Sequence, residues 1–345
     1  MDRPIRILVV TSEWPTAEQP YRVPYLVRHV DFLRRAGVQV DVFPFRGARR
    51  PVNYMRARQQ LQRRLRETPY DLVHAHFGQS ALLPWPKRLP LVVTFHGCDI
   101  QGVKRPDGRM SWGGAVLQKL SQLVARRAEA VILVSERMRC FLPPSVHAPV
   151  IPMGLDFDQL PEMSQEDARR HLGMAPSEKL VLFVGDPNEP VKRYDLARCA
   201  VDLLNRRYPA RLVVGWGVLP RQIPVMMRAC DVLVMTSIQE GSPCVVKEAL
   251  ACDLPVVSLN VGDVPVRLDG VEGCEVCADE RPETIAASLE RTLRRGGRIL
   301  GRQAVLDLDE RLLAEQVIAV YRGVLANASA RTRGLAAQPM AARVE

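Results

Sequence analysis

The sequence predicts an α/β protein built from two Rossmann-like domains whose parallel sheets face a central cleft. Three observations support this prediction. The chain has 345 residues, of which 47% are hydrophobic and 25% charged, so it is long enough to bury two cores. Short apolar segments alternate with segments of helical spacing, and this alternation occurs twice. A proline-rich stretch without periodicity, residues 142–163, separates the two series.

The first series begins with a β-branched strand at residues 6–10 and a segment of helical spacing at residues 23–36. The alternation in VQVDVF predicts the next strand, at residues 38–43. The segment 55–67 is rich in arginine and has the spacing of a helix. Further strands are predicted at 72–75, 91–94 and 130–134, with a helix at 115–130.

The second series begins with a helix at Ser164, which is a good N-cap and is followed by Asp167 in a weaker form of the capping box. Strands are predicted at 180–184, 211–214, 232–235 and 254–259, and helices at 194–207, 283–294 and 311–325. We therefore divide the chain into an N-terminal domain (1–150), a C-terminal domain (151–310), a helix (311–328) that packs back toward the first domain, and a disordered tail (329–345).

Lysine and arginine are concentrated in the first half of the chain. Residues 1–150 contain 24 Lys and Arg against 11 Asp and Glu, whereas the remaining residues contain 24 against 27. This asymmetry favours an anionic partner for the first half, and an arginine-rich surface that only confers solubility explains it equally well. Nucleic acid is disfavoured as that partner, because no known binding module is present and only 6% of the residues are aromatic.

The chain shows no sign of export or membrane insertion. Its opening apolar run of about five residues is too short for a secretory signal, and no later stretch reaches the roughly 20 apolar residues of a membrane span. The eight cysteines form no CxxC pair or zinc spacing and lie mostly in apolar runs, as buried reduced thiols do. We therefore expect a cytoplasmic protein.

The stretch QEGSPCVVKEALACDLPVV, residues 239–257, predicts a seat for a phosphate or diphosphate. It follows the predicted strand 232–235, with Ser242 as N-cap and Pro243 as first helical residue. The free amides of a helix start and the helix dipole bind anions. The amides expected to do so belong to Gly241, Ser242, Cys244 and Val245.

Two carboxylates, Glu240 and Glu248, flank this seat in the sequence. Glu248 lies on the helix one turn from its start, where it can reach paired sugar hydroxyls, and Glu240 can reach a different part of the same ligand. The alternative is that Glu240 is a solvated loop residue and Glu248 an exposed helix position.

Seven segments of the chain occur in the order and spacing of one known family. They are TSEWPTAEQPYRVPYLVRHVDFLRRAGVQVDVF, DLVHAHFG, VVTFHGCDI, AVILVSERMRCFL, VIPMGLDFDQL, VGDPNEPVKRYDLA, and the pair Glu240 and Glu248 followed by EALACDLPVVSLNVGDVP. Together they resemble the retaining GT-B glycosyltransferases of family GT4. The resemblance covers almost the whole chain and implies the GT-B fold and an enzyme that transfers hexosyl groups.

The resemblance implies that the two domains bind different substrates. The C-terminal domain would hold a nucleotide-diphosphate sugar and the N-terminal domain the acceptor. Glu248 matches the glutamate on the ribose hydroxyls, Glu240 the one beside the transferred sugar, and Lys192 the lysine on the diphosphate. Arg193 stands where the family often has glycine, so it is either a second cation or a surface residue. No metal or other cofactor is implied.

His96 matches the histidine that lines the cleft beside the sugar in the family, although an isolated histidine is more often a satisfied core residue. Asp99, Arg22 and Arg28 are weaker candidates for the cleft and the acceptor. His74 and His76 share one face of a strand, but no third ligand accompanies them, so a metal site is disfavoured.

Three positions depart from the family pattern. Val23 stands where the first loop usually has a glycine that approaches the diphosphate, and Arg22 could compensate by its charge. Asp186 replaces a common arginine, and Val266 a common glutamate. These departures leave open a relative that binds ligand without turnover.

The expected function is transfer of a sugar to a glycan or lipid-linked acceptor, in surface polysaccharide or glycolipid synthesis. The arginine-rich helix 55–67 could hold the protein on anionic lipid, at the inner face of the cell membrane, or could simply be a solvated surface. A nucleotide-sugar 2-epimerase and a non-catalytic binding protein for nucleotide sugars or lipid headgroups are the alternatives. An NAD dehydrogenase is disfavoured, since no GxGxxG follows a strand.

Overall fold

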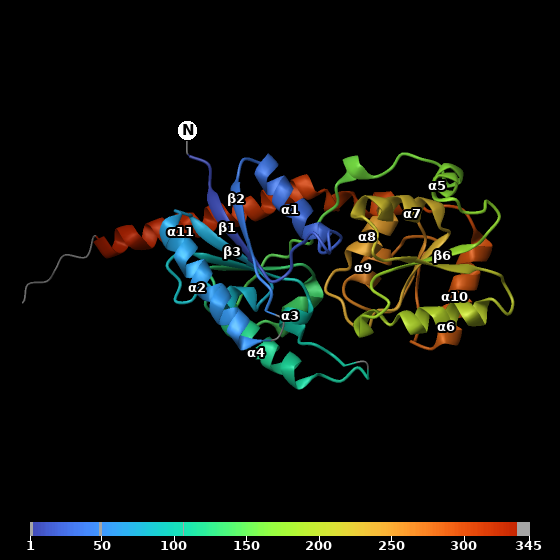
Figure 1. Cartoon of the computed structure of the whole chain (residues 1–345), viewed down its shortest axis with the longest axis horizontal. Helices are drawn as coiled ribbons and strands as arrows, with labels where there is room; N and C mark the ends of the chain where they lie inside the picture. The colour runs from blue at the N-terminus through green and yellow to red at the C-terminus, as the bar shows by residue number, and fades with distance from the viewer. Residues whose placement is uncertain (1–2, 48–49, 106, 337–345) are drawn as a thin grey trace, which may run out of the picture.

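The computed structural model describes residues 3–47, 50–105 and 107–336 and contains two five-stranded parallel sheets (Figure 1). The first sheet has the order β2-β1-β3-β4-β5. Parallel registry places Val9 of β1 opposite Val42 on one side and His74 on the other. Its strands are β1 (Arg6–Thr11), β2 (Gln39–Pro44), β3 (Leu72–His76), β4 (Leu91–Phe95) and β5 (Ala130–Leu133).

Helices cover both faces of the first sheet, because the strand order changes direction at β1 and right-handed crossovers on its two sides then lie on opposite faces. They are α1 (Pro24–Arg35), α2 (Pro51–Glu67), α3 (Cys98–Gln101) and α4 (Trp112–Ala125), with short 3-10 turns η1 (Ser80–Leu82) and η2 (Glu136–Phe141). No helix in the described part of the chain combines the length and hydropathy that a membrane span needs.

The second sheet has the order β10-β9-β8-β6-β7 and is also parallel throughout its described strands. Its strands are β6 (Leu180–Val184), β7 (Arg211–Gly215), β8 (Val232–Met235), β9 (Val256–Ser258) and β10 (Glu275–Val276). Its helices are α5 (Gln165–Leu172), α6 (Tyr194–Leu204), α7 (Ile223–Ala229), α8 (Cys244–Ala251), α9 (Val264–Leu268) and α10 (Pro282–Arg295), with 3-10 turns η3 (Phe157–Gln159), η4 (Pro190–Lys192), η5 (Pro220–Gln222) and η6 (Gly301–Leu308).

The last helix, α11 (Glu310–Ala336), returns from the second sheet to the first and lies beside α1 (Figure 1). Tyr321 of α11 is fully buried, and its hydroxyl is 2.6 Å from Nδ1 of His74 in β3. The predicted disordered tail is therefore wrong for residues 329–336, where a run rich in alanine and arginine continues the helix. The rest of that predicted tail lies outside the described residues.

Several element boundaries differ from the prediction. The helix α2 begins at Pro51, where a proline fits the first turn, and its Met55 is exposed although Leu61 is buried. The short helices α3, α7 and α9 and the strand β10 carry too few residues for a periodic signal. Ser164 caps α5 as predicted, accepting from the amide of Asp167.

The hydrophobic core has three parts. One runs from Val30 of α1 through Tyr321 of α11 to Leu250 of α8, so it joins the two halves of the molecule. A second lies under α2 and α4 and includes Leu61 and Val124. The third packs α6 and α10 on the second sheet.

Candidate active site between the two sheets

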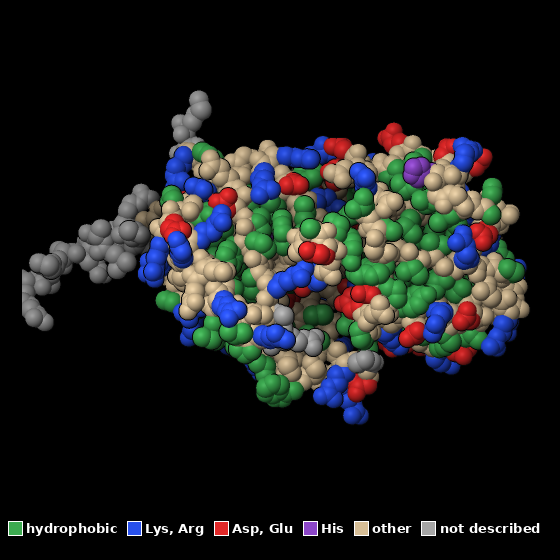
Figure 2. Space-filling view, in the orientation of Figure 1, with side chains coloured by type: hydrophobic (Ala, Val, Ile, Leu, Met, Phe, Trp, Pro, Cys, Tyr) green, Lys and Arg blue, Asp and Glu red, His purple; other side chains and the backbone are tan. Residues whose placement is uncertain are grey.

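The carboxyl ends of strands from both sheets meet between the two halves, where the surface is hollowed (Figure 2). From the first sheet, β4 runs into His96 and Gly97. From the second, β8 runs into the loop that holds Glu240 and Gly241. A Cβ on Gly241 would lie 2.1 Å from the carbonyl oxygen of His96, and Gly97 has φ +145°, a value that favours glycine. The two glycines therefore allow the two backbones to touch.

The start of α8 offers unpaired backbone donors to this hollow. Among the described residues, the amides of Gly241, Ser242, Cys244 and Val245 have no hydrogen-bond acceptor. Such amides, together with the helix dipole, attract an anion. The four amides that the sequence assigns to the seat are thus unpaired within the described chain, and anion binding there stays a prediction.

The predicted cap of α8 is wrong in detail. Pro243, and not Ser242, is the N-cap residue, and it makes no side-chain cap bond. The hydroxyl of Ser242 instead donates to Asp263 at 2.7 Å. The hydrogen bond to this charged acceptor holds the hydroxyl beside Asp263, away from the amides that an N-cap side chain would bind.

Lys192 and Glu240 form an ion pair beside the start of α8. The Nζ atom of Lys192, at the end of η4, is 2.7 Å from Oε1 of Glu240, and both side chains are partly exposed. Burial alone would lower the pKa of Lys192, but attraction to Glu240 and the hydrogen bond between them outweigh it, so the pKa is raised. The lysine is therefore a permanent cation at this point.

Glu248 lies on α8, and its partner comes from the other half of the molecule. The guanidinium of Arg28, in α1, is 3.4 Å from Oε1 of Glu248. The Nε atom of Arg28 is buried and has no partner within the described residues. The structure thus brings the weak cleft candidate Arg28 together with the main candidate Glu248.

His96 follows the end of β4, where its backbone meets that of Gly241, and its side chain is neutral. Burial, and then the charges of His29 and Lys247, lower the pKa of His96 to about 3. Its Nε2 atom lies 3.0 Å from Nδ1 of His76, and its Nδ1 atom makes no hydrogen bond within the described chain. One ring nitrogen of His96 is therefore engaged by the protein and the other remains for a ligand.

Asp99 holds the loop that carries His96, instead of projecting into the hollow. The carboxylate is buried and accepts from the backbone amides of Gly97 at 2.8 Å and of His96 at 3.1 Å. Amides of Gly78 and Ile100 complete this set. Burial raises the pKa of Asp99 to about 6, against these four donors, which lower it.

Arg193 and Arg22 are not assembled with the other candidates. Arg193 pairs with Glu280 at 2.6 Å and has φ 53°, the left-handed conformation that the family's glycine would adopt easily. Arg22 pairs with Glu13 and Gln19 in its own loop. In both cases a nearby acceptor holds the guanidinium.

Two glutamines of the site were not predicted. The side chain of Gln239 donates to the carbonyl of Gly102 at 2.7 Å, and that of Gln101 donates to the carbonyl of Glu240 at 3.3 Å. Both bonds join the first half to the second. No sequence pattern marks such contacts, because they depend on how the two domains meet.

Four histidines lie in or near this region, and they do not form a metal centre. His74 is bound to Tyr321 and Thr94, and the ring of His76 lies 5.8 Å from that of His29. Across residues 3–47, 50–105 and 107–336, no group of three or more His, Cys, Asp or Glu side chains could hold a metal ion.

The three departures from the family pattern have distinct surroundings. Val23 is the N-cap of α1 and has φ 40° and ψ 51°, a left-handed conformation that a β-branched residue adopts only with strain. The carboxylate of Asp186 accepts from the amide of Asn188 at 2.9 Å in a local turn. The side chain of Val266, on α9, is exposed.

Comparisons with known proteins assign this chain to a family. Residues 1–159 match the family described as Glycosyltransferase Family 4, and residues 178–295 match Glycosyl transferases group 1. The chain is 30% identical over 321 residues to a D-inositol 3-phosphate glycosyltransferase of Segniliparus rotundus, an alignment that covers 79% of this chain and 69% of that protein. It is 26% identical over 228 residues to TuaC of Bacillus subtilis, named for teichuronic acid biosynthesis, covering 56% of this chain and about half (54%) of TuaC.

Solved structures share the fold over nearly the whole chain. A sucrose-phosphate synthase from Thermosynechococcus elongatus superposes with a TM-score of 0.80 at 18% identity, covering 94% of this chain and all of that one. HepE of Anabaena, solved in complex with UDP-glucose, superposes with a TM-score of 0.63 at 16% identity over 94% of this chain and 100% of that one. The chain therefore belongs to glycosyltransferase family 4, and the predicted GT-B fold is confirmed.

Proposed function

We propose that the protein is a retaining hexosyltransferase that moves a sugar from a nucleotide-diphosphate donor to a glycan or lipid-linked acceptor, in the synthesis of a surface polysaccharide or glycolipid. The observation that carries this proposal is the arrangement around α8. Four unpaired amides, the pair of Lys192 and Glu240, and Glu248 surround one place at the edge of the second sheet. They fit the diphosphate, the sugar and the ribose of one donor.

Each group has a chemical role in this proposal. The amides at the start of α8 bind the diphosphate, and Lys192 stabilises the charge that develops on it as the glycosidic bond breaks. Glu240 accepts hydrogen bonds from hydroxyls of the transferred sugar, and Glu248 from those of the ribose. His96, neutral and with Nδ1 unengaged, orients the sugar from the first half.

The reaction requires no nucleophile from the protein. The acceptor oxygen forms its bond to the anomeric carbon on the face from which the diphosphate departs, and the departing phosphate takes the proton of the acceptor hydroxyl. The configuration is then retained. Lys192 and the amides of α8 lower the barrier because they bind the leaving group more tightly as its charge grows.

The names of similar proteins support this class of donor and acceptor. The structure of HepE was solved in complex with UDP-glucose, and TuaC is named for the biosynthesis of teichuronic acid. A UDP-sugar is therefore the first donor to test. The proposal includes no metal or other cofactor. It does include a peripheral position of the protein at the inner face of the membrane.

The test is binding and slow hydrolysis of UDP-, GDP- and ADP-sugars by the wild type and by Glu248→Ala. Loss of the Glu248 carboxylate, which accepts hydrogen bonds from the ribose in this proposal, should raise the Kd of the nucleotide sugar about 10- to 100-fold. Glu290→Ala is the matched control, because Glu290 is also a helical glutamate of the second half with a similarly shielded side chain, 23% exposed against 18%, paired with an arginine. A Kd that is unchanged in Glu248→Ala would contradict the proposed donor site.

The second candidate function is that of a non-catalytic binding protein for nucleotide sugars or lipid headgroups. The strain at Val23 favours it, as do the departures from the family pattern at Asp186 and Val266. That candidate predicts donor binding without release of free nucleotide, with or without acceptor. A 2-epimerase would instead return an epimerised nucleotide sugar, which the same assay detects.

A further inference from the structure

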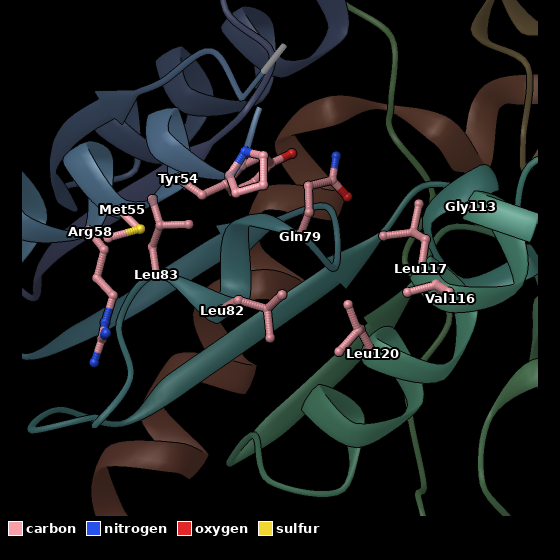
Figure 3. Close-up of a pocket in the computed structure, with 11 residues that line it drawn as sticks. Tyr54, Met55, Arg58, Gln79, Leu82, Leu83, Gly113, Val116, Leu117 and Leu120 are labelled. Carbon is pink, nitrogen blue, oxygen red and sulfur yellow. The ribbon is translucent and has the colours of Figure 1, made fainter. Parts of the chain in front are cut away.

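A groove on the outer side of the first half lies between α2 and α4. It has a volume of about 470 Å³, within the size range of small-molecule sites. Tyr54 and Met55 of α2 form one wall, Leu117 and Leu120 of α4 the other, and Leu82 of η1 the floor (Figure 3). We call this feature the apolar groove, because hydrocarbon makes up nearly all of its lining.

Apolar side chains that line the groove are exposed to solvent, and so is Trp112 at the start of α4. The side chains of Met55 and Trp112 are 63% and 80% exposed, and those of Val116 and Leu120 are exposed as well. Hydrophobic side chains with Lys and Arg beside them are visible over this part of the molecule (Figure 2). Exposed apolar side chains gathered in one patch are typical of a surface that binds a partner or a membrane.

A second hollow adjoins the apolar groove and has the opposite character. Its volume is about 400 Å³, and it shares Met55 and Arg58 with the groove. Its other lining side chains are Gln59, Gln62, Arg63 and Arg66, all on α2. We call it the arginine hollow.

The charges around these two features are nearly all positive. Glu67, paired with Arg63, is the only acidic residue within α2, and α4 has none. Arg66 has no partner within the described residues, and Lys119 of α4 is exposed. A hydrocarbon-lined groove beside a cluster of arginines complements a molecule with an apolar chain and an anionic head.

We propose that the apolar groove takes a hydrocarbon chain of an anionic membrane lipid, whose head group lies in the arginine hollow. The protein would then dock on an anionic bilayer by the face formed by α2 and α4. A sugar does not fit the groove, since its hydroxyls would meet few polar groups there. A bilayer also accounts for the arginines, which a groove for an apolar peptide helix does not need.

The groove reaches the side of the first sheet that carries the candidate active site. Gln79, which lines the groove, lies three residues after the end of β3, and the amide nitrogen of its side chain donates to Ser12 in the loop after β1. Its Oε1 atom is buried and has no partner among the residues that the structure describes. This inference deepens the proposed function, because a lipid-linked acceptor would be presented at the acceptor half by the same membrane.

The test is co-sedimentation with vesicles of phosphatidylcholine, with and without phosphatidylglycerol. The wild type should bind only the anionic vesicles. The double variant Val116→Asn, Leu120→Asn should lose at least tenfold in affinity, and its exposed positions permit folding. Its matched control is Leu300→Asn, Leu312→Asn, which removes two exposed leucines elsewhere and should bind as the wild type does.

The same co-sedimentation assay tests the contribution of the arginines in the arginine hollow. Arg63→Gln with Arg66→Gln should weaken binding about fivefold for each arginine lost. Arg206→Gln with Arg207→Gln, on the exposed end of the second half, removes the same charge and should have no effect. Acyl chains brominated along their length should quench Trp112, and Trp112→Phe should abolish that signal.

The inference would be overturned if the wild type and the groove variant bound anionic vesicles equally well. It would also be overturned if the wild type bound no vesicles. It would also be overturned by a dimer that forms through the groove and is lost in the variant, since a second copy would then be the occupant. Donor hydrolysis, measured without lipid, should be unchanged in the groove variant. If the wild type hydrolyses no donor yet binds vesicles, the proposed function fails and the lipid groove stands.

Discussion

Three histidines, the buried His74 and His76 and the partly buried His96, tie the stability of the protein to pH. Burial holds the pKa of His74 and His76 well below the ordinary value, and lowers that of His96 to about 3. In the unfolded chain these groups take up protons near pH 6.5, whereas in the folded protein they remain neutral. The unfolded state therefore binds more protons below pH 6.5, and stability falls as the pH falls.

The expected size of this effect is about 2 kcal/mol for His96 between pH 6.5 and pH 5. His76→Phe should reduce the loss of unfolding free energy over that range, because one of the protonating groups is gone. Urea unfolding at pH 7.5 and pH 5 measures it. His147→Asn, at an exposed position, is the control. If the unfolding free energy of His76→Phe fell with pH as much as that of the wild type, the prediction would be contradicted.

At this scale the sequence identified some candidates that the structure brings together, such as Lys192 and Glu240, and others, such as Arg22 and Asp99, whose side chains are held by their own loops. Lys192, Glu240 and Glu248 stand in a recognisable pattern, and the structure places Lys192 beside Glu240. The link between His76 and His96 and the bonds of Gln101 and Gln239 could not be predicted, since they join strands or domains far apart in the sequence. The sequence left open whether Arg193 is a second cation or a surface residue, because its partner, Glu280, is 87 residues away.

Among the elements, α1 begins with a strained residue. Val23 has the left-handed conformation, which costs a residue with a Cβ about 1–2 kcal/mol. Val23→Gly should therefore raise the free energy of unfolding by about 1 kcal/mol after the entropy of glycine is counted. Val27→Gly, within the same helix, should lower it by a similar amount. Denaturant unfolding of both variants checks the prediction, and destabilisation by both would show that Val23 is not strained.

The contact between the loop after β4 and the loop after β8 leads to a second prediction for the elements. A Cβ on Gly241 would overlap the carbonyl of His96, so Gly241→Ala should push the two loops apart. Misplacement by about 1 Å commonly costs 100-fold in rate, so donor hydrolysis should fall by about that factor. Gly323→Ala, in α11, meets no atom within 4 Å and should leave hydrolysis unchanged. Full activity of Gly241→Ala would show that this contact does not set the site.

The long periodic elements were predictable and the short ones were not. The strands β6 and β8 have the bounds that the sequence predicts, since a buried parallel strand is a continuous apolar run. The four-residue helix α3 and the two-residue strand β10 exist only because the neighbouring fold holds them. The extension of α11 through Ala336 was missed because the segment after residue 328 contains small and polar residues and Gly334, which are typical of a helix end.

For the whole molecule, two chain crossings join the halves and lie side by side. Leu155, in the first crossing, donates to the carbonyl of Leu308 at 2.7 Å, and the amide of Glu310 donates back to Leu155 at 2.9 Å. The buried Nζ of Lys247 is 2.9 Å from the carbonyl of Met153, and the carboxylate of Glu310 is 2.6 Å from His29. These buried polar contacts fix where the two halves meet. The two-domain plan was readable from the repeated pattern, but the crossing contacts were not.

The central claim is that one nucleotide sugar binds between the two halves. Amide hydrogen exchange with and without a UDP-sugar tests it most directly, because it locates the ligand on both halves at once. Peptides covering residues 240–248 and 96–101 should both exchange more slowly with the sugar present, and peptides of α10 should not change. Protection confined to one half, or none in either peptide, would contradict the account.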